Sequence, residues 1–304
     1  MIKKRRHHYV WRHYLRPWAT SEKIWCLREG KIFNSNLMGV AQERDFYKIK
    51  KLTNDELEFV RKLIKSPYSK EDAELNEGWL KMFQMPFELE GAFKKNQPNN
   101  DKINDLINTQ IHNFEEDFHS QIESEGIAHL DALLSRDTSF YDETKNRMSF
   151  LFFISLQYLR TKKIQKNVGN SVASICPINF ENIWPVLRHV YATQIAKSIY
   201  MQKDKYRLIL LINQTGAPLI TCDQPIINTY AVESGITEEV DKLEFYYPLS
   251  KDLAILVTEE IKYSKSKSYF LNFEDVVNYN KAIKTCSNEQ IFSSCRESLE
   301  YFCL

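Results

Sequence analysis

Two adjacent histidines near the start of the chain are the first residues that could do chemistry. His7 and His8 follow four cations and precede His13, Tyr14 and Arg16. Imidazoles can give and take protons near neutral pH, and a guanidinium can hold a phosphate through two hydrogen bonds. Phosphodiester cleavage needs both kinds of group. The alternative is a surface segment whose ring nitrogens bond to water or to the backbone.

Two further pairs combine charge with a predicted structural element. Arg44 and Asp45 lie in the run QERDFY, beside two aromatic residues, and form either a structural ion pair or a substrate clamp. Gln157 and Arg160 are three residues apart on a mostly apolar predicted helix, so they lie on the same side of it. Because a buried arginine needs a partner or a cavity, the second pair is a candidate binding feature.

Asp223 follows a predicted strand and stands two residues before Pro225, in the run TCDQP. A carboxylate at a strand end can orient a histidine or bind a divalent ion, but it also commonly starts a turn. The sequence is compatible with a divalent metal without requiring one. It identifies no set of metal ligands and leaves the cofactor open.

Carboxylate and imidazole groups also alternate in a long predicted helical region. Glu116 and His119 are three residues apart, and Glu125 and His129 are four apart, as in carboxylate-bridged di-metal bundles. Such a site needs matching pairs on other helices, and none is evident, so solvated helix faces are favoured. Phosphate loops, G-x-S-x-G elbows and H-E-x-x-H pairs are absent from the sequence.

The elements that must position these residues are mainly helices. Thr53 and Glu56 form a capping-box pattern. Apolar residues at helical spacing and the scarcity of glycine and proline predict the other helices, with Pro185 in a first turn. The predicted helices are 54–65, two or three within 71–134, then 146–168, 180–202 and 273–298.

Short β-branched and aromatic runs predict strands in two parts of the chain. KIWCLRE and KIFNSN surround Glu29-Gly30 as an N-terminal hairpin, and YRLILLIN, PLITCD, LEFYYPL and LAILVT form an antiparallel sheet of about four strands. The fold class is therefore α+β, predominantly helical, with a small antiparallel sheet made mainly by the C-terminal third and the hairpin. We expect one domain, 1–304, with 71–134 as a helical insertion.

Composition restricts the partners and the compartment. The 41 Lys and Arg balance 40 Asp and Glu, so nucleic-acid binding needs a local patch. The one patch is Lys3, Lys4, Arg5 and Arg6, for which a solvated tail is favoured. Six separated cysteines are expected to be reduced, mostly buried thiols. Without a secretory signal or membrane span, the predicted location is the cytoplasm.

The motifs also carry a resemblance when they are taken in order. RRHHYVWRHYLRPWA, ERDFY, QYLRT, TCDQP and YYPLS make the chain similar to DUF4238, an uncharacterised bacterial family of unknown function. Trp11 and Arg12 depart from the family's Pro and Gln, and Cys222 and Gln224 from its Ser and Asn. The resemblance implies no activity. It implies a shared polar set: His7, His8, Tyr14, Arg16, Arg44, Asp45, Gln157, Arg160, Asp223 and Pro225.

A pocket built from imidazoles, guanidiniums and a carboxylate fits a phosphate-containing substrate. The leading hypothesis is a nuclease-like phosphodiesterase that prefers RNA, acting as a toxin or phage-defence effector. Its catalytic residues are His7, His8 and Asp223, and its substrate-binding residues are Tyr14, Arg16, Arg44, Asp45, Gln157 and Arg160. The alternatives are a non-enzymatic module binding nucleic acid or protein, and a nucleotide-modifying transferase. A protein partner or a homo-oligomer is compatible with each.

Overall fold

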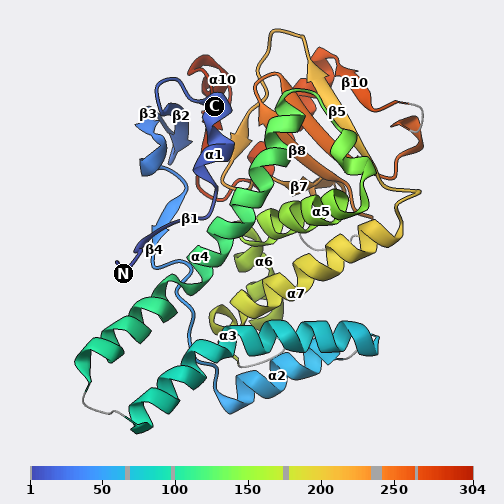
Figure 1. Ribbon diagram of the computed structural model, residues 1–304. Coiled ribbons are helices and arrows are strands. Elements are labelled where there is room, and N and C mark those ends of the chain that lie inside the picture. Colours follow the sequence, from blue (N-terminus) through green and yellow to red (C-terminus); the bar gives the residue numbers. More distant parts are fainter. Residues whose placement is uncertain are drawn as a thin grey trace. The chain divides into compact units, whose positions relative to one another are not determined.

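The computed structural model describes residues 2–65, 69–96, 100–173, 178–233, 242–263 and 266–303 (Figure 1). It confirms a helix-rich α+β fold. The chain divides into two compact units, each assembled from three separate stretches. The first unit comprises Met1–His7, Glu43–Ile122 and Gln165–Gln194. The second comprises His8–Gln42, Glu123–Ile164 and Ile195–Leu304. The predicted insertion at 71–134 therefore contributes residues to both units.

Helices build the first unit. The Thr53 hydroxyl accepts a hydrogen bond from the Glu56 amide at 3.2 Å, and the Glu56 carboxylate accepts one from the Thr53 amide at 2.8 Å. This capping box begins the first long helix as predicted. Pro185 stands inside a helix, beyond the predicted first turn. The helices with residues in this unit are α2 (Asn54–Lys65), α3 (Lys70–Asn96), α4 (Asp101–Leu134), α6 (Lys162–Ala173) and α7 (Phe180–Met201).

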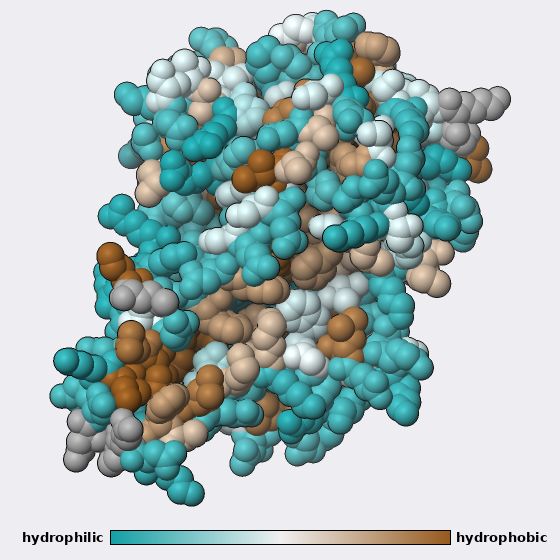
Figure 2. Space-filling model, in the orientation of Figure 1, coloured by the Kyte–Doolittle hydropathy of each residue, from teal (hydrophilic) through white to brown (hydrophobic). Residues whose placement is uncertain are grey.

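Apolar side chains gather on the surface of the first unit. Figure 2 shows them at the lower left, where Figure 1 places parts of α3 and α4. Among the large apolar residues of these two helices that are about half exposed are Met85, Leu89, Phe93 and Leu106. Single exposed apolar residues are normal in soluble proteins, whereas a contiguous exposed group is typical of an interaction surface.

A five-stranded sheet lies in the second unit, in the order β10-β5-β9-β8-β7. Three of the four predicted C-terminal strands belong to it, paired antiparallel, but β10 joins β5 in parallel. Its strands are β5 (Arg207–Asn213), β7 (Ile227–Asn228), β8 (Phe245–Ser250), β9 (Leu253–Thr258) and β10 (Ser268–Leu271).

The N-terminal hairpin is part of a second, four-stranded sheet in the order β3-β2-β11-β6. Glu29 and Gly30 both have positive φ, which is the backbone of a tight hairpin turn. The strand before Asp223 was predicted in the C-terminal sheet, and this was wrong: β6 pairs with β11 beside the hairpin. The strands are β2 (Lys23–Arg28), β3 (Lys31–Asn36), β6 (Thr221–Cys222) and β11 (Ile291–Ser293).

Two predicted helices are shorter than expected. The helix predicted at 146–168 ends with α5 (Thr144–Leu159), and α6 begins after Arg160 and Thr161. The helix predicted at 273–298 ends with α9 (Phe273–Cys286), because residues 291–293 form β11. Shorter helices are α1 (Arg12–Leu15), η1 (Arg16–Trp18), η2 (Leu37–Gly39), η3 (Ser139–Asp142), α8 (Thr229–Glu233), η4 (Ile261–Tyr263) and α10 (Glu297–Glu300).

One apolar core joins both larger sheets to α9 in the second unit. Leu27 of β2, Leu211 of β5 and Ile283 of α9 are among its buried side chains. Tyr246 of β8 stacks on Tyr279 of α9, with ring centroids 4.2 Å apart. A third, two-stranded sheet pairs β1 (Arg6–His8) with β4 (Gln42–Arg44), where the chain passes between units.

Substitution of Gly126 in α4 tests how tightly the second unit is packed around it. A Cβ added there would lie 2.7 Å from the Phe153 ring, closer than side chains tolerate. We expect Gly126→Ala to lower the free energy of unfolding by about 1–3 kcal/mol through overpacking. Gly78→Ala in α3 is the matched control, because it meets open space and should add up to about 1 kcal/mol through helix propensity. Equal effects in urea denaturation would contradict the close packing.

Among the described residues, no helix has the length and apolar character to cross a membrane. The described cysteines are free thiols, of which Cys26 and Cys222 are buried and Cys303 is exposed. Cys286 and Cys295 are half-buried, so the prediction of mostly buried thiols is wrong for the described cysteines, and Cys176 lies outside the described residues.

Candidate functional site

Three side chains that could take part in chemistry lie on one face of α4 in the first unit. His112, Glu115 and His119 are spaced by three and four residues, so they project from one side of the helix, and all three are buried. His119 was predicted to share a helix face with Glu116, but the carboxylate beside it is Glu115. The predicted solvated faces are wrong for His119 and His129, since both are buried. The pattern His-x-x-Glu-x-x-x-His was the available signal.

His112, at one end of this set of three side chains, pairs with Asp45. The Nε2 atom of His112 lies 2.8 Å from Oδ1 of Asp45. Asp45 has a φ of 59° in a turn, and its amide donates to the Arg5 carbonyl. The His112 side chain is 8% exposed and that of Asp45 is 34% exposed. The carboxylate therefore reaches solvent while the imidazole stands behind it.

Nearby cations keep the Asp45 carboxylate ionised. Desolvation raises its pKa, but the hydrogen bond and charge of His112, with the charges of Arg44 and Arg5, outweigh this and lower the pKa overall. Arg44 also forms the expected ion pair with Asp45, at 3.7 Å, and most of its side chain is exposed. The pair is thus a partly exposed acid–base unit in a positive environment.

The basic N-terminal segment is held against α4, so it is not a free tail, although its cationic side chains are exposed to solvent as predicted. The Lys4 amide donates to Oδ1 of Asn113 at 2.8 Å, and Nδ2 of Asn113 donates to the Ile2 carbonyl at 2.9 Å. Lys4 also forms an ion pair with Asp117 at 2.7 Å. Lys3, Arg5 and Arg6 are exposed. Because Asn113 adjoins His112, the cations lie beside the His112–Asp45 pair.

His7 packs behind this site. Its Nδ1 accepts from the Tyr47 amide at 2.8 Å, so its Nε2 carries the proton that is donated to the Lys4 carbonyl at 2.7 Å. Its ring lies edge-on to His112, with centroids 6.2 Å apart. Burial lowers the pKa of His7, with the charge of His112 acting in the same direction. The described contacts make His7 a neutral support for the N-terminal strand.

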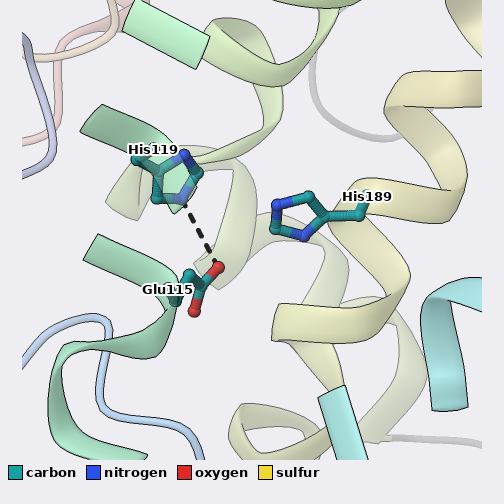
Figure 3. Close-up of side chains that lie close together, drawn as sticks. All are labelled: Glu115, His119 and His189. Atoms are coloured by element: carbon teal, nitrogen blue, oxygen red, sulfur yellow. Dashed lines mark ion pairs between the residues drawn. The ribbon is translucent and has the colours of Figure 1, made fainter. Parts of the chain in front are cut away.

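Deeper in the first unit, α4 and α7 contribute a second polar cluster (Figure 3). Figure 3 shows Glu115, His119 and His189 pointing toward one another. Their ligand atoms all lie within 4.8 Å of one another, and all three side chains are buried. Nε2 of His119 is 3.4 Å from Oε1 of Glu115, which also pairs with the buried Arg188. We call these four residues the inner cluster.

His189 has a defined tautomer in the inner cluster. Its Nδ1 lies 2.7 Å from the Pro185 carbonyl, so this nitrogen carries the proton. Its Nε2 has no hydrogen-bond partner among the described residues. Burial, assisted by the Arg188 charge, lowers the pKa of His189 to about 3. The ring is neutral and presents an unprotonated nitrogen to the cluster.

In the second unit, Arg160 is fully buried and contacts Glu123 of α4 and the backbone of His8 and Tyr9. Its Nη1 pairs with Glu123 at 2.6 Å, its Nε donates to the Tyr9 carbonyl at 3.2 Å, and its Nη2 donates to the His8 carbonyl at 3.1 Å. The predicted partner for a buried arginine is therefore Glu123. Gln157 is also buried, and its Nε2 has no partner among the described residues.

Asp223 anchors a loop in the same unit. Its carboxylate accepts amide hydrogen bonds from Asn288, Glu289 and Gln290 at 2.7–3.0 Å. Burial raises its pKa, and the three amides oppose this. Gln290 also donates to the Tyr9 hydroxyl at 3.0 Å. The structure thus connects the segment after His8 with Asp223 through Gln290.

The remaining predicted residues have ordinary partners. The Tyr14 hydroxyl is buried, 2.6 Å from the Thr221 hydroxyl, and donates to the Pro248 carbonyl at 2.7 Å. Arg16 is half exposed and pairs with Glu22 at 3.3 Å. Pro225 is buried. His7, Arg44 and Asp45 belong to the first unit, and the other predicted site residues belong to the second.

A basic cavity of about 350 Å³ lies within the second unit. Four cations and one carboxylate are among its lining residues, together with two tyrosines. The guanidinium of Arg147 stacks on the Tyr141 ring at 4.6 Å, and Lys267 pairs with Asp142 at 2.7 Å. The charged and aromatic lining residues are Tyr141, Asp142, Arg147, Lys203, Tyr206, Arg207 and Lys267. This excess of positive charge suits an anion.

Two buried histidines make the stability of the protein sensitive to acid. Burial lowers the pKa of His7 and of His129 from 6.5, so below pH 6.5 the unfolded chain binds protons that the folded chain refuses. Their contribution is complete above pH 6.5 and is lost as the pH falls toward their folded pKa values. We expect the urea midpoint to fall between pH 7.5 and 5.5, and His129→Phe to reduce that fall. An unchanged pH dependence in His129→Phe would contradict this.

The fold and these sites define an α+β protein with a His112–Asp45 pair that reaches the surface and a buried Glu–His–His cluster contributed by α4 and α7. The chain belongs to the family described as protein of unknown function (DUF4238), which matches residues 6–297. The resemblance carried by the sequence motifs is thereby confirmed. No curated protein and no solved structure matches the chain.

Proposed function

We propose that this chain is a nuclease-like phosphodiesterase that prefers RNA. The observation that carries the proposal is the His112–Asp45 pair, with a 2.8 Å contact, a solvent-facing carboxylate and the adjacent cations of the N-terminal strand and β4. Relative to the sequence hypothesis, the proton-transfer role moves to His112 and Asp45. Arg44 keeps its predicted part in holding the substrate.

The chemistry follows from the charges at this site. The ionised Asp45 carboxylate takes the proton of an RNA 2′-hydroxyl and shares it with His112 through the Oδ1–Nε2 hydrogen bond, and the 2′-oxygen attacks the adjacent phosphorus. The bond from phosphorus to the 5′-oxygen breaks, leaving a 2′,3′-cyclic phosphate; the 5′-oxygen takes a proton from water, and the His112–Asp45 pair returns its proton to the solvent. Arg5 and Arg44 stabilise the negative charge that grows on the phosphate oxygens. The lack of a 2′-hydroxyl makes DNA a poor substrate.

The N-terminal cations supply nucleic-acid affinity in this proposal. Lys3, Lys4, Arg5 and Arg6 approach the backbone phosphates, so binding should weaken steeply with salt. A nuclease of this kind would work in the cytoplasm as a toxin or phage-defence effector. The rival is a binding module that uses the same cations without chemistry.

The test compares a single-stranded RNA oligonucleotide with the DNA of the same sequence, using the full chain. We expect RNA cleavage with 2′,3′-cyclic phosphate ends and much slower loss of the DNA. Salt-sensitive RNA binding without cleavage of either strand would replace the enzyme with a binding module. Equal cleavage of both would refute the 2′-hydroxyl mechanism.

The basic cavity of the second unit favours a second candidate, a nucleotide-modifying transferase. Its four cations fit a di- or triphosphate. Titration calorimetry with nucleotides tests this reading. Binding that is lost in Arg147→Ala supports it, and the absence of nucleotide binding by the wild-type chain excludes it.

A further inference from the structure

We infer that Glu115, His119 and His189 form a binding site for one transition-metal ion of the zinc type. The three donors come from two helices of the first unit, α4 and α7, and their ligand atoms lie within 4.8 Å of one another. Two imidazoles and one carboxylate are a ligand set that zinc takes in proteins. The inference does not rest on the proposed nuclease activity, because metal binding is measured without RNA.

The His189 side chain is arranged as metal-binding histidines usually are. Its Nδ1 donates to the Pro185 carbonyl, which fixes the tautomer and directs the lone pair of Nε2 into the cluster. Its ring is enclosed by Trp79, Phe83 and Phe118, with centroid distances of 4.9–5.5 Å. A buried ring nitrogen without a hydrogen-bond partner is costly, and an ion would satisfy it.

The Glu115 side chain is also positioned as a metal ligand would be. Arg188 and His119 approach the same carboxylate oxygen, Oε1, so both orient the Glu115 carboxylate within the inner cluster. Hydrogen-bonded partners that orient a ligating carboxylate are a regular part of metal sites. Tetrahedral zinc places its donors roughly 3.4 Å apart, so the ligand atoms need to close from 4.8 Å by up to roughly 1.4 Å.

The charges predict what completes the coordination. Glu115 and Arg188 neutralise each other, so the protein leaves the charge of the ion largely uncompensated. A hydroxide or a phosphate oxygen is therefore expected as the additional ligand, and inorganic phosphate should increase the affinity for the ion.

The experiment titrates the EDTA-treated and desalted full chain with Zn²⁺ and with Co²⁺. We expect one ion per chain and a Co²⁺ absorption spectrum of a four- or five-coordinate site without a thiolate charge-transfer band. His189→Phe keeps an aromatic ring and removes the donor, so it should weaken binding at least a hundredfold. His129→Phe is the matched control, because it makes the same substitution at a buried histidine outside the inner cluster and should leave binding unchanged.

Each result decides the inference. If His189→Phe fails to fold, as judged by circular dichroism, His119→Gln takes its place, and the wild-type Co²⁺ spectrum still reports the ligand type. Absence of a stoichiometric ion in the wild-type chain would overturn the site and leave a buried ion-pair network. A thiolate band, or equal binding by His189→Phe, would assign the metal to other groups.

Discussion

His112→Asn should lower the rate of RNA cleavage by a factor of about 10²–10⁴, the usual contribution of a positioned acid–base group. Asn retains the hydrogen-bonding capacity to Asp45 but cannot exchange protons. RNA affinity should change little, because the N-terminal cations that contact phosphates are untouched. Initial rates and fluorescence-anisotropy binding of the purified variant measure the two effects separately.

The matched control is His13→Asn. His13 also faces an aspartate, with its Nε2 3.5 Å from Asp131, and is partly exposed, but it belongs to the second unit. We expect His13→Asn to cleave RNA at the wild-type rate. Wild-type cleavage by His112→Asn, or an equal loss in both variants, would remove the proton-transfer role from the His112–Asp45 pair.

Arg160→Met should lower the free energy of unfolding by about 3–5 kcal/mol, because it leaves the Glu123 carboxylate, which is only 13% exposed, without its cation. It also removes the donors to the His8 and Tyr9 carbonyls. Desolvation raises the pKa of Glu123 and Arg160 lowers it, so the unpaired carboxyl would take up a proton more readily. Urea denaturation at pH 7.5 gives the difference.

Two companion variants separate the buried charge from simple loss of an arginine. Arg160→Met with Glu123→Gln should recover part of the stability, because no uncompensated charge remains. Arg16→Met should cost less than about 1 kcal/mol, since Arg16 pairs with Glu22 at the surface. A double variant no more stable than Arg160→Met alone would show that the two carbonyl contacts dominate.

Local signals in the sequence predicted the elements that are determined locally. Thr53 and Glu56 identify the start of α2, and Glu29-Gly30 identifies the hairpin turn, because each pattern satisfies neighbouring backbone groups. The break between α5 and α6 has no proline or glycine at Arg160 and Thr161, and it depends on partners distant in sequence. Sequence periodicity does not contain that information.

The candidate site was predicted in part. Arg44 and Asp45 were identified from their charges beside aromatic residues, but the partner of Asp45 is His112, 67 residues further along the chain. His119 was paired with Glu116, whereas the carboxylate beside it is Glu115, because the sequence alone does not define which face of α4 is buried. No other histidine and no carboxylate lies within four residues of His189 in the sequence. Only the packing of α7 brings its side chain to Glu115 and His119 of α4.

A single 2′-deoxy substitution in an RNA oligonucleotide tests the central claim most directly. The full chain is incubated with the all-RNA strand and with the strand lacking one 2′-hydroxyl at a mapped cleavage position. The proposed mechanism predicts that cleavage stops at that linkage, continues at the others, and leaves 2′,3′-cyclic phosphate ends in the presence of EDTA. Unchanged cleavage at the deoxy position, or no cleavage of the all-RNA strand, would contradict it.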